Sequence, residues 1–322
     1  MGRFPFPSCP NGWYQVAFAR DLAPGDVRAL GYFGRDLVLF RGEDGTARLF
    51  DAYCPHLGAH LGVGGRVRGA GIQCPFHGWC FDGAGRVVAV PGLARRPPDA
   101  GVRRYPVAER NGVLFAFWHA AGAAPDWEVP LYRDDAGTWT DWTSSAYTVR
   151  THVQEMAENI LDRAHFFSVH DMAEPVEPRF DVRFEGPFMR VEQTMRMTTG
   201  PSAGVEILAR TTNCGPGMSA VRVDVATIET LALVAHTPID DERVDLHLSF
   251  CMKRIPDAGA MARIEAVNRE ITNAQFRQDI PIWEHKIYRE RPLLTAVDGP
   301  IARYRQWYRQ FYVEAPAEAA AP

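Results

Sequence analysis

Hydrophobic and polar positions alternate in short runs along residues 1–122, a pattern typical of β-strands. The runs are rich in β-branched and aromatic residues and lie at 13–19, 36–41, 47–51 and 112–118. The stretches EDGT and DGAG carry the Asp-Gly pairs that favour hairpin turns. The pattern therefore predicts a small all-β domain over residues 1–122.

The pattern changes after the Pro-, Ala- and Gly-rich stretch 121–130, which we interpret as a linker. Residues 151–170 have a helical pattern, residues 180–254 alternate as strands do, and residues 258–290 are helical again. These elements predict a second, α+β domain over residues 130–316, with a sheet and a long helix that together could enclose a ligand cavity. The tail at 317–322 is expected to be flexible.

Composition and charge narrow the possible functions. The chain has 322 residues, of which 46% are hydrophobic and 23% charged, and its net charge of −4 gives no reason to expect nucleic-acid binding. It has no apolar stretch long enough to span a membrane. The N-terminal segment lacks the apolar core of a signal peptide, so we expect a cytoplasmic protein.

The chain has six cysteines, which in a cytosolic protein are usually free and buried. Cys9, Cys80, Cys214 and Cys251 fit that interpretation. The other two stand in motifs of their own and need another explanation.

The first motif places one cysteine and one histidine on each of two neighbouring loops. Cys54 and His56 are separated by one residue, seventeen residues follow, and then come Cys74 and His77. A zinc site is one interpretation, although zinc fingers place their two cysteines together and their two histidines together. A proline after each cysteine stiffens the loop, and nearby glycines let the backbone approach a bulky inorganic centre.

A cysteine and a histidine on each loop also fit a two-iron cluster, in which two thiolates hold one iron and two imidazoles hold the other. The motif resembles that of Rieske [2Fe–2S] domains at every ligand position, with Cys54, His56, Cys74 and His77 as cluster ligands. His60 lies outside the motif and is interpreted as a loop or surface histidine. Such a cluster transfers electrons but has no open coordination position, so the chemistry must be decided elsewhere in the chain.

The second motif lies in the helical stretch and contains Asp162, His165 and His170. Asp162 and His165 are three residues apart and would share a helix face, where a carboxylate could orient a metal-bound imidazole. The two histidines are five residues apart and do not share a face. They can reach one metal only if the helix is distorted or ends between them.

Two histidines and one carboxylate form the ligand set of non-haem Fe(II) oxygenases. The candidates for the carboxylate are Asp240, Asp241, Asp279, Glu284 and Asp298. We favour Asp279, because it lies in an otherwise apolar helical stretch where a carboxylate needs a partner, and because Pro281 would bend the helix there. Glu284 is the alternative.

Together the two motifs resemble the oxygenase component of Rieske non-haem iron oxygenases, over essentially the whole chain. The stretches RAHFFSVH and QDIPIWEHK are similar to 3-ketosteroid 9α-hydroxylases, and HVQEMAENILDRAH is similar to cholesterol 7-desaturases. The resemblance implies a helix-grip catalytic domain, with an antiparallel sheet and a long helix, and independently supports Asp279 as an iron ligand. Glu158 departs from the asparagine of many ring-hydroxylating dioxygenases, which argues against arene dihydroxylation.

The resemblance also implies the cofactors and partners. These are one [2Fe–2S] cluster and one mononuclear Fe(II) per chain, O₂ as co-substrate, and electrons from NAD(P)H. The chain has no G-x-G-x-x-G nucleotide-binding motif, so a separate flavin reductase, a ferredoxin or both are expected. In this family the cluster of one subunit serves the iron of the next in a head-to-tail homotrimer, and Asp162 resembles the residue that bridges the two sites.

The expected substrate is a large, apolar, polycyclic, steroid-like molecule, which the enzyme hydroxylates or desaturates. Demethylation of an aromatic or alkaloid-like compound is an alternative that starts from the same C–H abstraction. An electron carrier without its own oxygenation, or a binding protein that has lost catalysis, are alternatives of other classes. The candidates for the cavity lining are Phe166, Phe167, Met195, Met197 and Phe276, each of which could equally be ordinary core.

Overall fold

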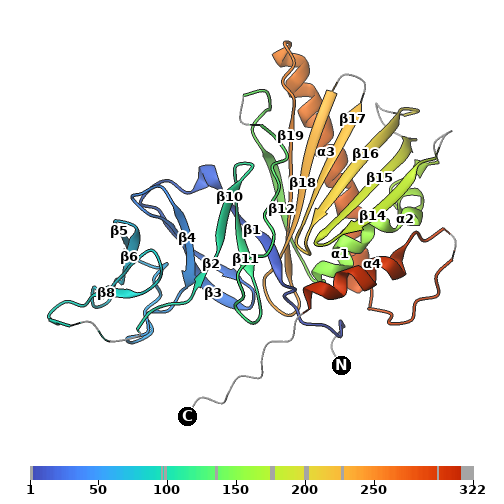
Figure 1. Ribbon diagram of the computed structural model, residues 1–322. Coiled ribbons are helices and arrows are strands. Elements are labelled where there is room, and N and C mark those ends of the chain that lie inside the picture. Colours follow the sequence, from blue (N-terminus) through green and yellow to red (C-terminus); the bar gives the residue numbers. More distant parts are fainter. Residues whose placement is uncertain are drawn as a thin grey trace.

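Two parts lie side by side in the computed structural model, three small sheets at the N-terminal end and one large sheet with helices at the other (Figure 1). The structure describes residues 3–95, 97, 100–134, 137–174, 178–198, 203–225, 228–295 and 297–312. The tail expected at 317–322 lies outside the described residues. The exact domain boundaries at 122 and 130 stay a prediction.

The N-terminal part is all β, as the alternating pattern predicts. Its first sheet has the order β1 (Gly12–Phe18), β11 (Val113–Trp118), β10 (Val107–Arg110). Its second has the order β2 (Val27–Tyr32), β3 (Arg35–Arg41), β4 (Ala47–Asp51), β9 (Arg104–Tyr105). The third, at the outer end of the molecule, has the order β5 (Arg66–Arg68), β6 (Gly71–Gln73), β7 (Cys80–Phe81), β8 (Val87–Ala89).

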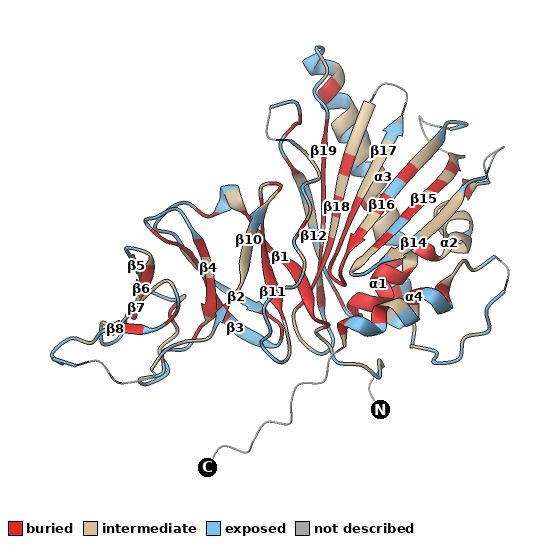
Figure 2. Cartoon of the chain, viewed as in Figure 1, coloured by how far each residue is buried: buried red, intermediate tan, exposed pale blue. Residues whose placement is uncertain are grey.

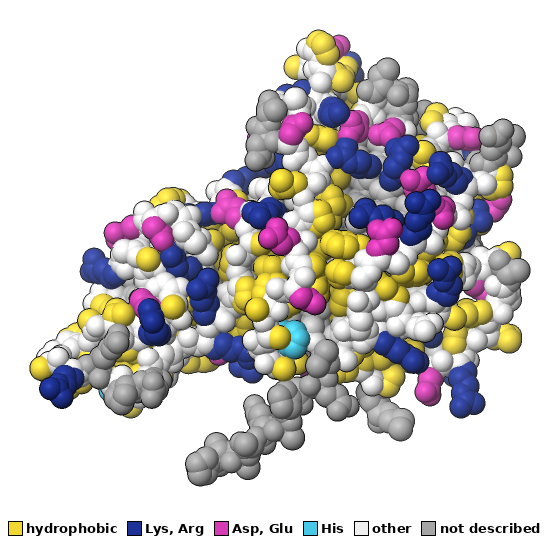
Figure 3. Space-filling model, viewed as in Figure 1, with side chains coloured by type: hydrophobic (Ala, Val, Ile, Leu, Met, Phe, Trp, Pro, Cys, Tyr) yellow, Lys and Arg dark blue, Asp and Glu magenta, His cyan; other side chains and the backbone are white. Residues whose placement is uncertain are grey.

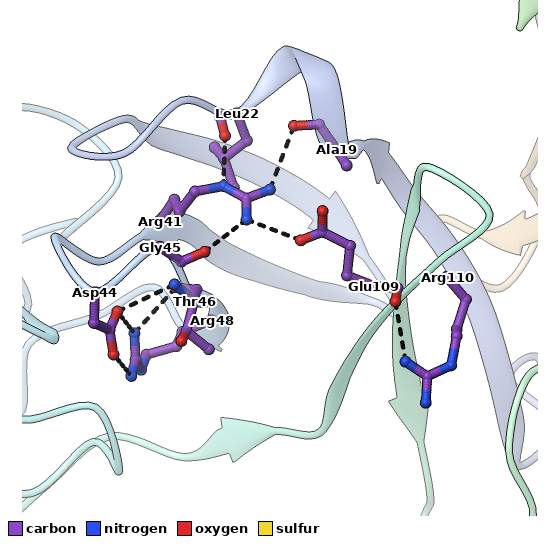
Figure 4. Close-up of polar contacts among 9 residues, drawn as sticks. All are labelled: Ala19, Leu22, Arg41, Asp44, Gly45, Thr46, Arg48, Glu109 and Arg110. Atoms are coloured by element: carbon purple, nitrogen blue, oxygen red, sulfur yellow. Dashed lines mark hydrogen bonds and ion pairs between the residues drawn. The ribbon is translucent and has the colours of Figure 1, made fainter. Parts of the chain in front are cut away.

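A buried arginine joins these elements (Figure 4). The guanidinium of Arg41, at the end of β3, donates to the backbone carbonyls of Ala19, Leu22 and Gly45 and pairs with the Glu109 carboxylate at 2.8 Å. Ala19 belongs to the short 3-10 helix η1 (Ala19–Asp21), and Glu109 belongs to β10. Because a guanidinium has five donors in a fixed fork, one side chain can satisfy several buried carbonyls.

The second part is built on one antiparallel sheet of eight strands. Seven of them follow one another across the sheet: β12 (Thr143–Val149), β19 (Val244–Met252), β18 (Ile228–Pro238), β17 (Met218–Val225), β16 (Glu206–Cys214), β15 (Phe188–Met197) and β13 (Met172–Ala173). The eighth, β14 (Phe180–Glu185), also pairs with β15. The predicted antiparallel sheet is thus confirmed.

The two faces of this sheet have different neighbours. Apolar side chains of one face, among them Cys214, Met218 and Leu233, pack against Trp13 and Phe117 of the first N-terminal sheet. The helices lie on the other face. Figure 2 shows buried segments in β1 and β11, where the two parts meet, and along α1. This division leaves the helix-covered face for a cavity.

The helices are α1 (Val153–Glu158), the 3-10 helix η2 (Asn159–Leu161), α2 (Arg163–Ser168), α3 (Ala258–His285), α4 (Ile301–Tyr308) and the 3-10 helix η3 (Arg309–Phe311). The helical stretch expected at 151–170 is therefore three short pieces, because Asp162 adopts an extended conformation between η2 and α2. The long helix expected at 258–290 is confirmed as α3, although it ends five residues earlier, at His285, and Pro281 lies inside it.

The surface of the large sheet is mixed in charge. Ion pairs join neighbouring strands, such as Arg210–Asp224 at 2.7 Å, and Figure 3 shows basic and acidic side chains interspersed over this part of the molecule. Among the described residues, no helix is both long and apolar enough to cross a membrane.

Candidate metal centres

The two loops of the first motif have the same backbone frame. In each loop the cysteine N–H donates to the carbonyl five residues later, and the cysteine carbonyl accepts from the glycine N–H four residues later, at 2.8–3.2 Å. Gly58 and Gly78 hold matching left-handed conformations, with φ of 73° and 71°. Glycine adopts such angles without strain, which explains the glycine at the same place in both loops.

The side chains of the motif divide into a buried pair and an exposed pair. Cys54 and Cys74 are each 3% exposed, and burial, reinforced by a hydrogen bond with Cys74, raises the pKa of the Cys54 thiol. His56 and His77 are exposed, with ring centroids 4.6 Å apart, and the His56 ring stacks on Trp79. The sulfur atoms therefore face the core and the imidazoles face the surface.

This arrangement distinguishes between two interpretations of the motif, a site for one metal ion and a site for two. One zinc ion would need all four donors around one point. Within the described part of the chain, these four residues do not form a group of three or more ligand atoms within 4.8 Å of one another. Two irons require only that the sulfurs pair and the imidazoles pair. The geometry favours the two-iron interpretation over zinc.

The second motif is organised by the break in the helix at Asp162. The Asp162 carboxylate caps α2 by accepting hydrogen bonds from the N–H groups of Ala164 and His165. Its backbone carbonyl accepts a hydrogen bond from His165 Nδ1–H. The prediction of a carboxylate orienting the imidazole from a shared helix face is therefore wrong in detail, because it is the carbonyl of Asp162 that orients the ring, and Asp162 lies outside the helix.

The two histidines meet because α2 ends between them, one of the two possibilities that the sequence leaves open. The helix ends at Ser168, and Asp171 has a positive φ of 51° directly after His170. The ring centroids of His165 and His170 are 5.1 Å apart.

Asp279 of α3 completes the group. His165, His170 and Asp279 bring their ligand atoms within 4.8 Å of one another. His170 Nε2 lies 3.4 Å from Asp279 Oδ2, and these two side chains are only 3% and 7% exposed. These three residues, which we call the triad, have the composition and closeness of a 2-His-1-carboxylate site.

The other carboxylate candidates lie elsewhere. Glu284, the alternative, accepts from the N–H of Arg150 at the surface. Asp240 pairs with Arg243 in a hairpin turn, Asp241 accepts from the Ser8 hydroxyl, and Asp298 caps a turn at Thr295. Each of these carboxylates is thus occupied by an exposed contact outside the triad.

Neighbouring groups orient both imidazoles. His170 Nδ1–H donates to Gln278 Oε1 at 2.9 Å, and His165 Nδ1–H donates to the Asp162 carbonyl, so Nε2 is the ring nitrogen that each imidazole can offer to a metal. Burial lowers the pKa of His165. Burial alone would lower the pKa of His170 as well, but hydrogen bonds to Asp279 and Gln278 outweigh it and raise that pKa. A metal at His170 Nε2 would take the place of the proton that this nitrogen otherwise directs at Asp279, and the held Nδ1–H groups fix how both rings face it.

The triad lines a cavity of about 550 Å³ between the large sheet and α3. Four of the five residues predicted to line it do so, namely Phe166, Met195, Met197 and Phe276. Phe167 packs instead in the apolar cluster around Met172. Most of the remaining lining is aliphatic. The sequence does not predict the role of Gln278, for which the only indication is its position beside Asp279. It also does not predict the polar residues of the sheet that line the cavity.

Comparison with known proteins agrees with both centres. Residues 12–106 match the Rieske [2Fe-2S] domain, and residues 116–312 match the 3-ketosteroid 9alpha-hydroxylase C-terminal domain. The chain is 35% identical to a 3-ketosteroid-9-alpha-monooxygenase, oxygenase component, of Rhodococcus rhodochrous, over 94% of this chain and 84% of that one. It is 32% identical to the cholesterol 7-desaturase nvd of Bombyx mori, over 96% of this chain and 70% of that one.

Solved structures agree on the fold. Dicamba monooxygenase bound to dicamba superposes with a TM-score of 0.72 at 19% identity, over 94% of this chain and 97% of that one. NdmA of Pseudomonas putida CBB5 with caffeine gives a TM-score of 0.71 at 19% identity, over 96% and 97% of the two chains.

The fold and the two centres define a Rieske-type non-haem iron monooxygenase, which carries a [2Fe–2S] cluster and a mononuclear iron. Within that class, the chain belongs to the family that has the 3-ketosteroid 9alpha-hydroxylase C-terminal domain.

Proposed function

We propose that this chain is the terminal oxygenase of a multicomponent system that hydroxylates or desaturates a steroid-like substrate. A buried triad that opens onto a large, mostly apolar cavity is the observation that carries the proposal. A cavity of about 550 Å³ lies within the range of small-molecule sites. Similar proteins are named for 3-ketosteroids and for cholesterol, both polycyclic and apolar.

We assign the ligands as follows. Cys54, Cys74, His56 and His77 hold the cluster, and the triad holds the mononuclear iron. When bound, Fe(II) in such a site supplies open positions for O₂, and the cluster supplies electrons. The protein's own residues have a separate task, because the cavity walls orient the target C–H bond and exclude water from it.

Electrons reach the chain from NAD(P)H through a separate reductase, a ferredoxin or both, and a cytoplasmic location is part of the same proposal. The exposed edge of the cluster loops supports electron exchange with another protein chain, since His56 and His77 lie at the surface among exposed Tyr53, Leu57 and Phe76.

We further propose a head-to-tail homotrimer. The third N-terminal sheet lies next to the cluster loops, and Figure 1 shows this sheet and α2 at opposite ends of the molecule. Electron transfer becomes steeply slower as the distance between two centres grows, so transfer within one chain would be slow. In a head-to-tail ring, the cluster loops of one subunit can instead approach Asp162 of the next. This arrangement supports the role of Asp162 as the bridge between a cluster histidine and His165.

The function is tested by turnover with a surrogate ferredoxin and reductase, NADH and ¹⁸O₂. The proposal predicts a 3-ketosteroid or cholesterol product that has either gained one labelled oxygen or lost two hydrogens, as mass spectrometry would show. His170→Ala is the control and should give neither product. If iron-replete protein converts no steroid but demethylates an aromatic methyl ether or alkaloid, the substrate class proposed here is wrong.

A further inference from the structure

The cavity floor has two chemically different ends. Strand register orders the lining along the sheet, because β17 and β18 are antiparallel and Ser219 lies opposite Val234, while Val225 lies opposite Ile228. One end of the floor, which we call the apolar end, is formed by Met195, Met197, Ile207, Val223 and Ile228. The other, which we call the polar end, is formed by Thr211, Ser219 and His236, whereas Gln193 is level with Val223 and Thr230.

Polar atoms at the polar end lack partners. Ser219 and His236 are 0% and 2% exposed, and neither Ser219 Oγ nor His236 Nδ1 has a hydrogen-bond partner among the described residues. Asn213, directly opposite Ser219 on β16, has a buried Oδ1 in the same condition. Ser219 and His236 line the cavity, whereas Asn213 does not. Since the great majority of buried polar atoms are hydrogen-bonded, the two unpartnered atoms that line the cavity indicate a place for a polar ligand group.

The polar end is uncharged. Burial, with a smaller effect of His247, lowers the pKa of His236 to about 3, so its imidazole is neutral at physiological pH. Arg263 is the one cation among the described residues that line the cavity. Arg263 lies in the first turns of α3, near Asn268, and Asn268 contacts Met252. Met252 is the strand partner of Thr230, which lies six residues along β18 from His236. Arg263 is therefore far from the polar end. A buried carboxylate at the polar end would therefore have no cation to pair with.

The metal triad lies between the two ends of the floor. Met172, two residues after His170, pairs with Met197 of the apolar end. Trp283, one turn after Asp279, belongs to the same apolar cluster as Leu246, which is the strand partner of His236. A substrate whose oxygen is held at the polar end would therefore extend along the cavity past the triad toward the apolar end.

We propose that Ser219 and His236 bind an uncharged oxygen function, a hydroxyl or a carbonyl, of the polycyclic substrate and thereby choose which carbon faces the triad. This inference rests on the proposed function. A hydroxyl matches the site best, because it can accept from one of these two groups and donate to the other.

The test is a binding cycle with testosterone and two analogues, one without the D-ring hydroxyl and one without the ring-A carbonyl. Equilibrium dialysis with iron-replete enzyme gives the affinities, and the products give the position of attack. Wild type is compared with Ser219→Ala and with His236→Leu. Two further variants are matched to each other, Thr211→Val at the polar end and Thr230→Val near the other end. Each removes one hydroxyl and keeps the shape of the side chain. Iron content and circular dichroism establish that each variant is folded.

We expect wild type to bind testosterone with about tenfold higher affinity than one of the two analogues, because one buried hydrogen bond typically changes affinity by that factor. Ser219→Ala should abolish that preference and broaden the products to more than one position, while Thr230→Val should retain it. If His236→Leu fails to fold, Ser219→Ala and Thr211→Val still decide the question.

Two results would overturn the inference. If the preference is absent from wild type, or persists unchanged in Ser219→Ala, the polar end does not bind the oxygen and the proposed function stands. If wild type binds none of the three steroids, the proposed substrate class fails and the inference fails with it.

Discussion

The two metal centres of this chain are built in opposite ways. The cluster motif lies within one short stretch, Cys54 to His77, on two matching loops whose histidines are exposed. The triad is assembled from α2, the segment that follows it and α3, so that His170 and its partner Gln278 are 108 residues apart. Its histidine–carboxylate pair is buried. One centre is local and open to the surface, and the other is long-range and enclosed.

The difference follows from what each centre does. A centre that receives electrons from another protein needs an exposed edge, and two stiff turns suffice to hold it. A centre that directs oxygen chemistry at a C–H bond needs a cavity that excludes water, and only packed elements of a folded domain can form one.

The largest expected effects come from removing a ligand of one centre, which should abolish metal binding at that centre and leave the other centre intact. Cys74→Ala should remove the cluster and leave the triad able to bind one iron, because the centres share no residue. Asp279→Ala should remove the single iron and leave the cluster spectrum intact. Iron and sulfide analysis with visible spectra checks both variants, and neither should turn over substrate. Loss of the cluster spectrum in Asp279→Ala would show that the centres are not independent.

Asp162 links the comparison, since it caps α2 and is proposed to bridge the centres. Asn is as good an N-cap as Asp, so Asp162→Asn keeps the cap while removing the charge. Asp162→Ala also loses the cap, at a cost of about 1 kcal/mol in unfolding free energy. Both variants should keep both metals and lose turnover, with single-turnover reoxidation of the cluster slowed. If Asp162→Asn turns over substrate normally, Asp162 only caps α2 and does not bridge the centres.

Gln278 tests whether the enclosed centre depends on its surroundings. Gln278→Leu removes the acceptor for His170 Nδ1–H and frees the ring to turn or change tautomer. Losing such a partner typically lowers metal affinity by about 10- to 100-fold. Titration with Fe(II) or Co(II) measures it. Gln275→Leu, which also lies on α3 and lines the cavity, is the matched control, and equal losses in the two variants would contradict the role of Gln278.

A smaller effect concerns the support beneath α1. Arg305 of α4 forms a two-pronged ion pair with Glu158 at 2.6 and 2.9 Å, and the two side chains are 14% and 9% exposed. Arg305→Met leaves a carboxylate without its partner and should lower the free energy of unfolding by about 3 kcal/mol. Arg210→Met, in an exposed pair, should cost less than about 1 kcal/mol. Chemical denaturation compares the two, and similar losses would contradict the argument.

The sequence predicts the local centre and much of the fold. The spacing of cysteines and histidines indicates the cluster ligands, since short loops leave little freedom, and the Asp-Gly turns place β3–β4 and β7–β8 correctly. The strands of the large sheet and the long helix follow from periodicity, and the antiparallel arrangement follows from the resemblance.

What the sequence does not predict depends on contacts between distant segments. The break at Asp162 is set by its cap and by its carbonyl on His165, which a helical pattern over 151–170 hides. The pairing of His170 with Gln278 arises only when the segment after α2 meets α3, and the polar end of the cavity only when β16, β17 and β18 pair. Asp279 could be favoured over Glu284 by polarity and resemblance, but its place beside the histidines required the fold.

The most direct test of the two-centre account is iron and acid-labile sulfide per chain in anaerobically purified protein, with an electron paramagnetic resonance spectrum after dithionite. The account predicts three irons and two sulfides, with a rhombic signal of low average g from a cluster that has histidine ligands. Two irons and two sulfides that persist after reloading with Fe(II) would contradict it, because the triad would then bind no metal.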